Sequence, residues 1–218
     1  MGLIGWLLGE EPGILERIKY AIDNGGIDKG SYGEWLTEYM LDNNSIRGYS
    51  KSLHNIYIPY RGRTSEIDIL FVHEKGLFII ESKNYSGWIF GNEEQKYWTQ
   101  CLRNKEKNRF YNPIMQNRTH INALSNYLKL DKDKMKSYIV FSDRCELKRV
   151  PYPTTEYLIV NRNAFLKNLR RELSDRQIIF TPDQVDKIVE TLQPLTNATI
   201  EVKSKHIENI DNKFKNNY

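Results

Sequence analysis

The sequence predicts a mixed α/β fold in which a central β-sheet is flanked by helices. Two runs, 67–72 and 77–80, are apolar on both faces, as expected for central strands that are covered on two sides. Helical patterns precede and follow these strands, which gives the expected order α-βββ-α-β-β-α-α. The chain has 218 residues, 39% of them hydrophobic and 12% aromatic, and is long enough to bury a core without disulfides.

The first firm element is a helix that begins at Ser31 and ends near residue 43. Ser31 and Glu34 have the spacing of a capping box, in which the glutamate reaches back to the start of the helix. Apolar residues at helical spacing predict one buried face, made of Tyr32, Trp35, Leu36, Tyr39 and Met40. The turn-rich segment 1–30 precedes this helix, and 14–22 can form a short helix within it.

Three strands follow, and the second and third are expected to form a hairpin. The first covers 53–58 and is expected to stop at Pro59, before the basic loop 61–63. In the hairpin, a connection of two or four residues pairs His73 with Gly76. A three-residue connection with a bulge at Gly76 would shift this register, and the sequence leaves both open.

The register decides whether charged residues meet at the end of the hairpin. In the first register Asp68 faces Glu81, and Glu66 faces Lys83. Alternation then places Asp68, Glu81 and Lys83 on one face of the sheet. Two facing carboxylates repel each other unless a cation lies between them, and carboxylate oxygens are suitable ligands for Mg²⁺. A metal with a nearby lysine suits phosphodiester hydrolysis, whereas the alternative is a structural ion pair at a strand end.

The rest of the chain continues the alternation of strands and helices. Asn112 before Pro113 is a typical helix start, and a helix is expected to run to about Leu128. Trp88 and Trp98 are expected in the core. The other expected elements are strands at 87–90, 97–98, 138–141 and 157–160, and helices at 162–173 and 182–193. We divide the chain into a lead segment (1–30), a core (31–145), a strand and helices that pack on it (146–200), and a polar tail (201–218).

Composition excludes several classes of protein. The net charge of +4 does not by itself indicate a nucleic-acid partner, and no apolar run approaches the ~20 residues of a membrane span. The start of the chain lacks the basic lead of a signal peptide, so we expect a cytoplasmic protein with no membrane partner. The chain has only two cysteines, Cys101 and Cys145, and they form no CxxC pair, so we expect neither a disulfide scaffold nor a zinc ribbon. The four histidines show no metal-ligand spacing.

An ordered set of motifs resembles a known family. The set consists of Gly33-Glu34, Ile67-Asp68, Ile80-Glu81-Ser82-Lys83-Asn84, Gly87, Trp98, and Asn112-Pro113-Ile114-Met115-Gln116-Asn117. It resembles the NERD (nuclease-related) domain, which is assigned to the PD-(D/E)XK nuclease superfamily, and it extends to Val140-Phe141-Ser142. Ile67 stands where the superfamily name has proline, a departure that leaves the acidic ligand in place.

The resemblance implies a restriction-endonuclease-like core and a Mg²⁺- or Mn²⁺-dependent deoxyribonuclease that hydrolyses phosphodiester bonds. It makes Asp68 and Glu81 the metal ligands and Lys83 the catalytic lysine. Gln116 matches an auxiliary glutamine, although a solvated side chain is the alternative. Glu34 matches a helix glutamate that supports the metal, although it can instead serve only the capping box.

Basic residues beside these motifs are candidates for phosphate contacts, which provide affinity rather than sequence choice. They are Arg61, Arg63, Arg103, Lys105, Lys107 and Arg109. The segment 103–109 can also be a simple solvated loop. DNA is the expected partner, with RNA not excluded and a homodimer or partner protein left open. The alternative function is an inactive or partner-dependent nuclease-like module that binds nucleic acid or protein.

Overall fold

The computed structural model describes residues 29–42 and 45–196. The predicted helix at 14–22, nearly all of the predicted lead segment and the predicted polar tail lie outside these residues. Within the described part of the chain, no helix is both long and apolar enough to cross a membrane.

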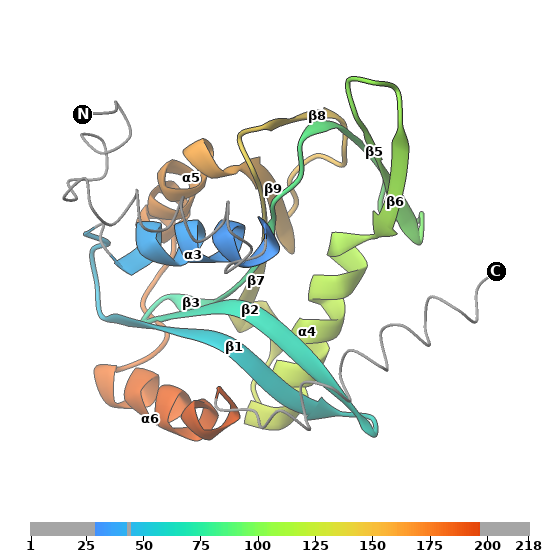
Figure 1. Ribbon diagram of the computed structural model, residues 1–218. Coiled ribbons are helices and arrows are strands. Elements are labelled where there is room, and N and C mark those ends of the chain that lie inside the picture. The colour runs from blue at the N-terminus through green and yellow to red at the C-terminus, as the bar shows by residue number, and fades with distance from the viewer. Residues whose placement is uncertain (1–28, 43–44, 197–218) are drawn as a thin grey trace, which may run out of the picture.

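The strands form two sheets that lie side by side (Figure 1). The larger has the order β1-β2-β3-β7-β9, in which β1, β2 and β3 are antiparallel and β7 and β9 run parallel to β3. Its strands are β1 (Ser50–Tyr60), β2 (Arg63–His73), β3 (Gly76–Lys83), β7 (Met135–Phe141) and β9 (Tyr157–Asn161). The smaller sheet, of order β6-β5-β4-β8, comprises β4 (Gly87–Phe90), β5 (Tyr97–Cys101), β6 (Lys107–Tyr111) and β8 (Cys145–Arg149).

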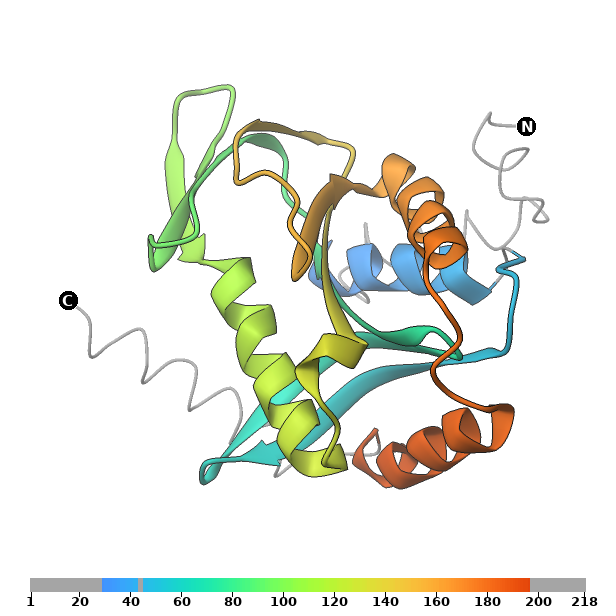
Figure 2. The same ribbon diagram turned by 180° about the vertical axis from the view of Figure 1, so that it is seen from behind.

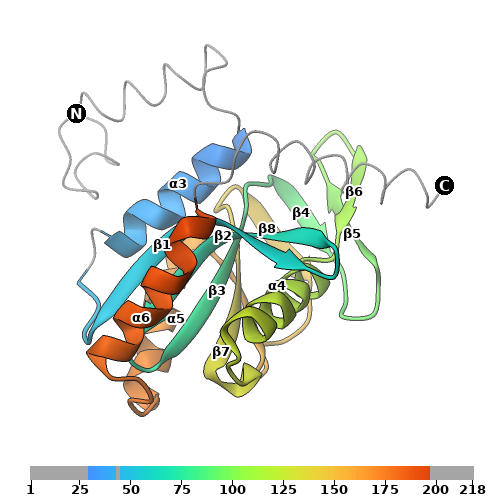
Figure 3. The ribbon, with the colours of Figure 1, turned by 90° about the horizontal axis from the view of Figure 1, so that it is seen from below.

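Helices cover both faces of the larger sheet, which confirms the predicted fold class and is compatible with a restriction-endonuclease-like core (Figures 1 and 2). The helices are α3 (Lys29–Asp42), α4 (Pro113–Leu128), α5 (Arg162–Asp175) and α6 (Pro182–Leu192), with 3₁₀ turns η1 (Lys132–Lys134) and η2 (Gln193–Leu195). Leu70 and Val72 of β2 pack in one core with α4 and α6, whereas Ile69 and Phe71 pack in another with α3 and α5. Figure 3 shows α6 lying along β1.

Local signals position α4 and α6 as predicted. The side chain of Asn112 accepts hydrogen bonds from the backbone amides of Ile114 and Met115 at the start of α4. Thr181 and Gln184 form a reciprocal capping box at the start of α6. These caps satisfy amides that have no partner within their own helix.

The register of the β2–β3 hairpin is also confirmed. His73 pairs with Gly76 and Ile69 with Ile80, so the connection has two residues and the bulged alternative is excluded. The β1–β2 hairpin likewise turns in two residues, Arg61 and Gly62, both with positive φ.

Several predicted boundaries are wrong for identifiable reasons. Strand β1 continues through Pro59, because it is an edge strand where a missing amide is tolerated. Helix α3 already includes Lys29, the first described residue, so Ser31 lies inside the helix and is not its N-cap. Where burial along α3 is described, from Gly33 onward, the buried positions are Gly33, Thr37 and Leu41, whereas the residues predicted for the buried face are half-buried there: Trp35, Leu36, Tyr39 and Met40.

Two strands of the smaller sheet, β4 and β5, were predicted from the sequence, and the other two, β6 and β8, were not. Strands β6 and β8 have mostly exposed residues and therefore lack an apolar alternation. Strand β6 forms by pairing with β5, so Lys107 and Arg109 lie on a strand and not in a loop. Trp98 is fully buried as predicted, whereas Trp88 is 40% exposed and the prediction of a core residue was wrong there.

His73, the last residue of β2 before the hairpin turn, gives a pH-dependent prediction. Its buried ring donates from Nε2 to the carbonyl oxygen of Arg47 and accepts at Nδ1 from the amide of Lys75, at 2.8 and 3.0 Å. Burial lowers the pKa of His73 below its ordinary value of 6.5. As the pH falls through 6.5, the unfolded chain therefore binds the proton first and the folded state loses stability.

We expect the wild-type protein to lose unfolding free energy relative to His73→Gln between pH 7.5 and 5, since glutamine retains a donor but does not titrate. Each pKa unit of difference between the two states corresponds to about 1.4 kcal/mol. Urea unfolding of both proteins across this range measures the effect. A constant difference at every pH would contradict the role of His73.

Candidate active site

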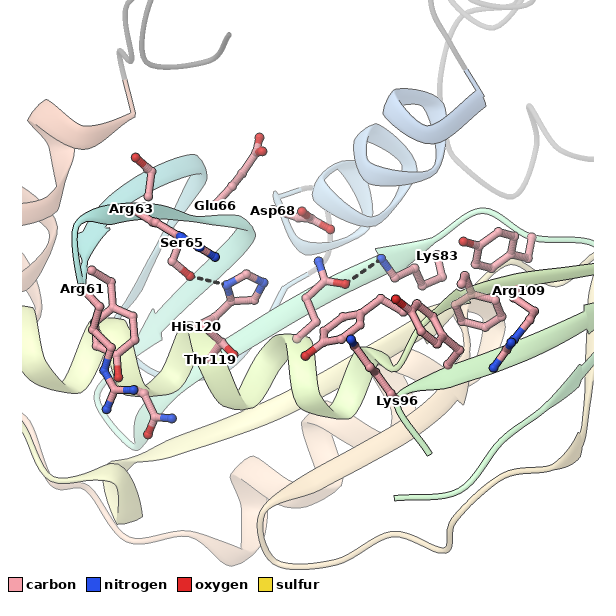
Figure 4. A pocket seen from close by; sticks show the side chains of 18 residues that line it. Arg61, Arg63, Ser65, Glu66, Asp68, Lys83, Lys96, Arg109, Thr119 and His120 are labelled. Atoms are coloured by element: carbon pink, nitrogen blue, oxygen red, sulfur yellow. Dashed lines mark hydrogen bonds between the residues drawn. The ribbon is translucent and has the colours of Figure 1, made fainter. Parts of the chain in front are cut away.

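A pocket of about 870 Å³ opens between the β1–β2 hairpin, the end of β3, helix α4 and the β5–β6 hairpin (Figure 4). Asp68, Lys83, Gln116 and His120 line it, and basic side chains stand at both of its ends. The pocket thus joins segments that are far apart in the sequence, and it contains most of the predicted site residues.

Lys83 is held between β3 and α4. Its Nζ donates to Glu81 Oε1 at 2.5 Å and to Gln116 Oε1 at 3.2 Å. Burial disfavours the charged ammonium, but Glu81 and Asp68 outweigh this effect and raise the pKa of Lys83 above its ordinary value. Lys83 is therefore a fixed positive charge, and the half-buried Gln116 accepts one of its hydrogen bonds.

Glu81 is 2% exposed, and its second carboxylate oxygen is not fully used. Oε2 lies 3.4 Å from His120 Nε2, but without the geometry of a hydrogen bond, so both atoms are buried without one. Burial would raise the pKa of Glu81, but Lys83 and His120 outweigh it and lower the pKa below its ordinary value. The carboxylate is thus charged, and its Oε2 has no hydrogen-bond partner among the described residues.

Asp68, on β2, is near enough to Glu81 and Lys83 to interact with their charges. The β2–β3 pairing ends at Ile69, and Asp68 Oδ2 instead accepts from the backbone amide of Ser82 at 3.0 Å. Side-chain alternation breaks here: Ile67 and Leu70, three residues apart, pack in the same core. The opposite residue of β1, Asn55, has a positive φ and is omitted from the pairing. Strict alternation therefore does not describe Asp68, although Glu81 and Lys83 follow it.

The acidic groups destabilise one another. Burial, then the charges of Glu81 and Glu34, raise the pKa of Asp68 well above its ordinary value. Burial, then Glu81 and Glu66, raise the pKa of Glu34 to about 7. The single ammonium group of Lys83 does not neutralise the neighbouring carboxylates, which are those of Asp68, Glu81 and Glu34. The site therefore favours an additional cation.

Helix α3 holds Glu34 near β3 by close packing at Gly33. A Cβ on Gly33 would lie 2.7 Å from the Cβ of Asn84, the residue after Lys83. Arg162 of α5 donates to the carbonyl oxygen of Gly33 and to Thr37 Oγ1, each at 3.1 Å. Since Ser31 lies inside the helix, Glu34 is not the third residue after an N-cap.

Two residues of the site, His120 and Ser65, were not predicted from the sequence. Ser65 Oγ shares a 2.7 Å hydrogen bond with His120 Nδ1, so Ser65 fixes the ring that faces Glu81. His120 follows Gln116 by four residues on α4, and this helical spacing is a signal that could have revealed it. No comparable signal marks Ser65.

The predicted phosphate contacts divide into two groups. Arg61, Arg63 and Arg109 line the pocket. Arg103, Lys105 and Lys107 are exposed but do not line it, because they lie around the far end of the β5–β6 hairpin. Lys96 also lines the pocket and was not predicted.

The donor set suits a hard divalent cation. Asp68 and Glu81 offer carboxylate oxygens, and Glu81 Oε2 has no hydrogen bond. Among the described residues, no group of three or more His, Cys, Asp and Glu side chains is placed to hold a metal ion. Two carboxylates with water and phosphate oxygens would have to complete the coordination of Mg²⁺ or Mn²⁺.

Comparison with known proteins supports a nuclease-related fold. The family model of the nuclease-related domain matches residues 29–142. An uncharacterized protein of Bacillus anthracis is 34% identical over 188 residues, which cover 85% of each chain. No solved structure matches the protein.

The mutual repulsion of the acids predicts that removing one of them stabilises the metal-free fold. Asp68→Asn keeps an oxygen for the Ser82 amide but removes a charge that Glu81 and Glu34 oppose. We expect a higher melting temperature in EDTA, by about 2–4 °C for each kcal/mol gained. The exposed Asp133→Asn is the control, and a lower melting temperature for Asp68→Asn would contradict the proposed repulsion.

Proposed function

Since the chain belongs to the nuclease-related domain family, we propose that it is a Mg²⁺- or Mn²⁺-dependent deoxyribonuclease that hydrolyses phosphodiester bonds. The observation that carries the proposal is the charged Lys83, held by Glu81 and Gln116 beside Asp68 in a pocket with basic ends. Acids to hold a metal, a fixed ammonium and surrounding cations together suit a phosphate substrate.

Each residue has a defined task in this proposal. Asp68 and Glu81 would hold the metal, which when bound acts as a Lewis acid and lowers the pKa of a water molecule. The Lys83 ammonium stabilises the negative charge that develops on the phosphate. The hydrogen bond to Gln116 holds this ammonium in the pocket. Ser65 orients the His120 ring, whose Nε2 lies 3.4 Å from Glu81, and Glu34 is a third acid whose charge acts on Glu81.

A binding module that does not cleave is the second candidate. The Lys83–Glu81 ion pair favours it, because this pair already neutralises one of the two metal-binding acids. Such a module would use the basic ends of the pocket for nucleic acid, or another surface for a partner protein. Metal binding and cleavage separate the two candidates.

Metal binding is tested by thermal unfolding. A ligand that binds only the folded state stabilises it by about 2.7 kcal/mol at one hundred times its dissociation constant. We expect Mg²⁺ or Mn²⁺ to raise the melting temperature of the wild-type protein but not that of Asp68→Asn or Glu81→Gln. The exposed Asp133→Asn should respond like the wild type, and an equal response of all four proteins would exclude this site.

Cleavage is tested with labelled linear, circular and single-stranded DNA. Replacing a group that stabilises transition-state charge costs roughly 10²–10³-fold in rate, so we expect this loss for Lys83→Ala. Lys148→Ala, which removes an exposed ion pair with Glu146, is the matched control. If Lys83→Ala cleaved as fast as the wild type with either metal, the mechanism would be wrong.

A further inference from the structure

Each end of the pocket has a tyrosine ring with one or more cationic side chains beside it. At the β1–β2 end, the guanidinium of Arg61 lies 5.2 Å from the ring centre of Tyr60. At the β5–β6 end, Arg109 and Lys96 lie 5.1 and 5.4 Å from the ring centre of Tyr97. All of these residues line the pocket, so each end combines an aromatic ring with positive charge.

The acidic site lies between these two ends. Figure 4 shows Arg61 at one end, Arg109 at the other, and Asp68 and Lys83 between them. The site is recessed, since Glu81 is 2% exposed and the side chain of Lys83 is 18% exposed. A substrate must therefore contact an aromatic, basic wall on each side and still bring a phosphate down to the acids.

Unpaired nucleotides fit these demands better than a duplex. The volume of about 870 Å³ lies within the roughly 300–1,000 Å³ of small-ligand pockets, which suits a short stretch of strand. Bases stack on aromatic rings and on arginine planes only when they are out of the helical stack. A flexible single strand can also place one phosphate at the recessed acidic site while the adjacent nucleotides contact the two ends of the pocket.

We infer that this pocket is a cleft for single-stranded DNA, gripped by Tyr60 and Arg61 on one side of the acidic site and by Tyr97, Lys96 and Arg109 on the other. This inference rests on the proposed function, which assigns the acidic site between the two ends of the pocket to a substrate phosphate. The substrate class is unpaired DNA, such as a single strand or a frayed end.

Binding is measured without cleavage, by fluorescence anisotropy in EDTA. The probes are a labelled thymidine strand of about 12 nucleotides and a hairpin duplex of similar length. We expect the wild type to bind the single strand at least tenfold more tightly. Loss of one stacking contact weakens binding roughly fivefold or more, so Tyr60→Leu and Tyr97→Leu should each show this loss.

Tyr152→Leu is the matched control, because Tyr152 is 90% exposed and lies outside the pocket. Leucine retains the packing of Tyr60 against the core, and thermal unfolding checks that each variant is folded. Equal or tighter binding of the duplex, or unchanged binding by both folded pocket variants, would overturn the inference.

A charge variant keeps the test decisive if a tyrosine variant does not fold. Arg109 is exposed on β6, and Arg109→Gln should lower the slope of log affinity against log salt by about 0.7 for a single strand. Arg170→Gln, exposed on α5, should leave the slope unchanged. Equal slopes for the two variants would remove Arg109 from the cleft and overturn the inference.

Adding Mg²⁺ or Mn²⁺ separates this inference from the proposed function. Preferential binding of the single strand without cleavage would support the cleft and contradict the nuclease. Cleavage of duplex DNA without a preference for single strands would support the nuclease and overturn the cleft.

Discussion

The buried ion pair between Lys83 and Glu81 is the interaction on which the site depends. Glu81 lies at the end of a strand covered on both faces, where an unpaired charge is very unfavourable. Removing one partner of such a pair typically costs about 3–5 kcal/mol. The two hydrophobic layers supply the stability that retains this pair and the acids around it, which repel one another.

The layers of the fold could be predicted because their signals are local. Doubly apolar strands indicated a sheet covered on both faces, and Asn112 and Thr181 indicated helix starts. Strands β6 and β8 could not be predicted, because their pairing partners hold them and not their own apolar pattern. The buried face of α3 was not predicted because it includes Gly33, which carries no apolar side chain. Gly33 is buried because Asn84 approaches it so closely that a Cβ would not fit.

The candidate site could be predicted in part from residue order. The two-residue hairpin places Glu81 and Lys83 as alternation requires, and Gln116 follows from the helix start at Asn112. The break in β2 at Asp68 could not be anticipated, since it arises from pairing with β1. His120 was missed because its role depends on Ser65 and Glu81, which come from two other strands.

The bond from Arg162 to Gly33 implies that the unit that folds is larger than the segment the family model matches, residues 29–142. Helix α5 holds α3 against β3 from beyond that boundary, and β9 covers the edge of β7. A fragment ending at the boundary would present β7 as an open edge, free to pair with other chains. Aggregation of such a fragment would then reflect the missing edge strand and not a defect of the nuclease-related core.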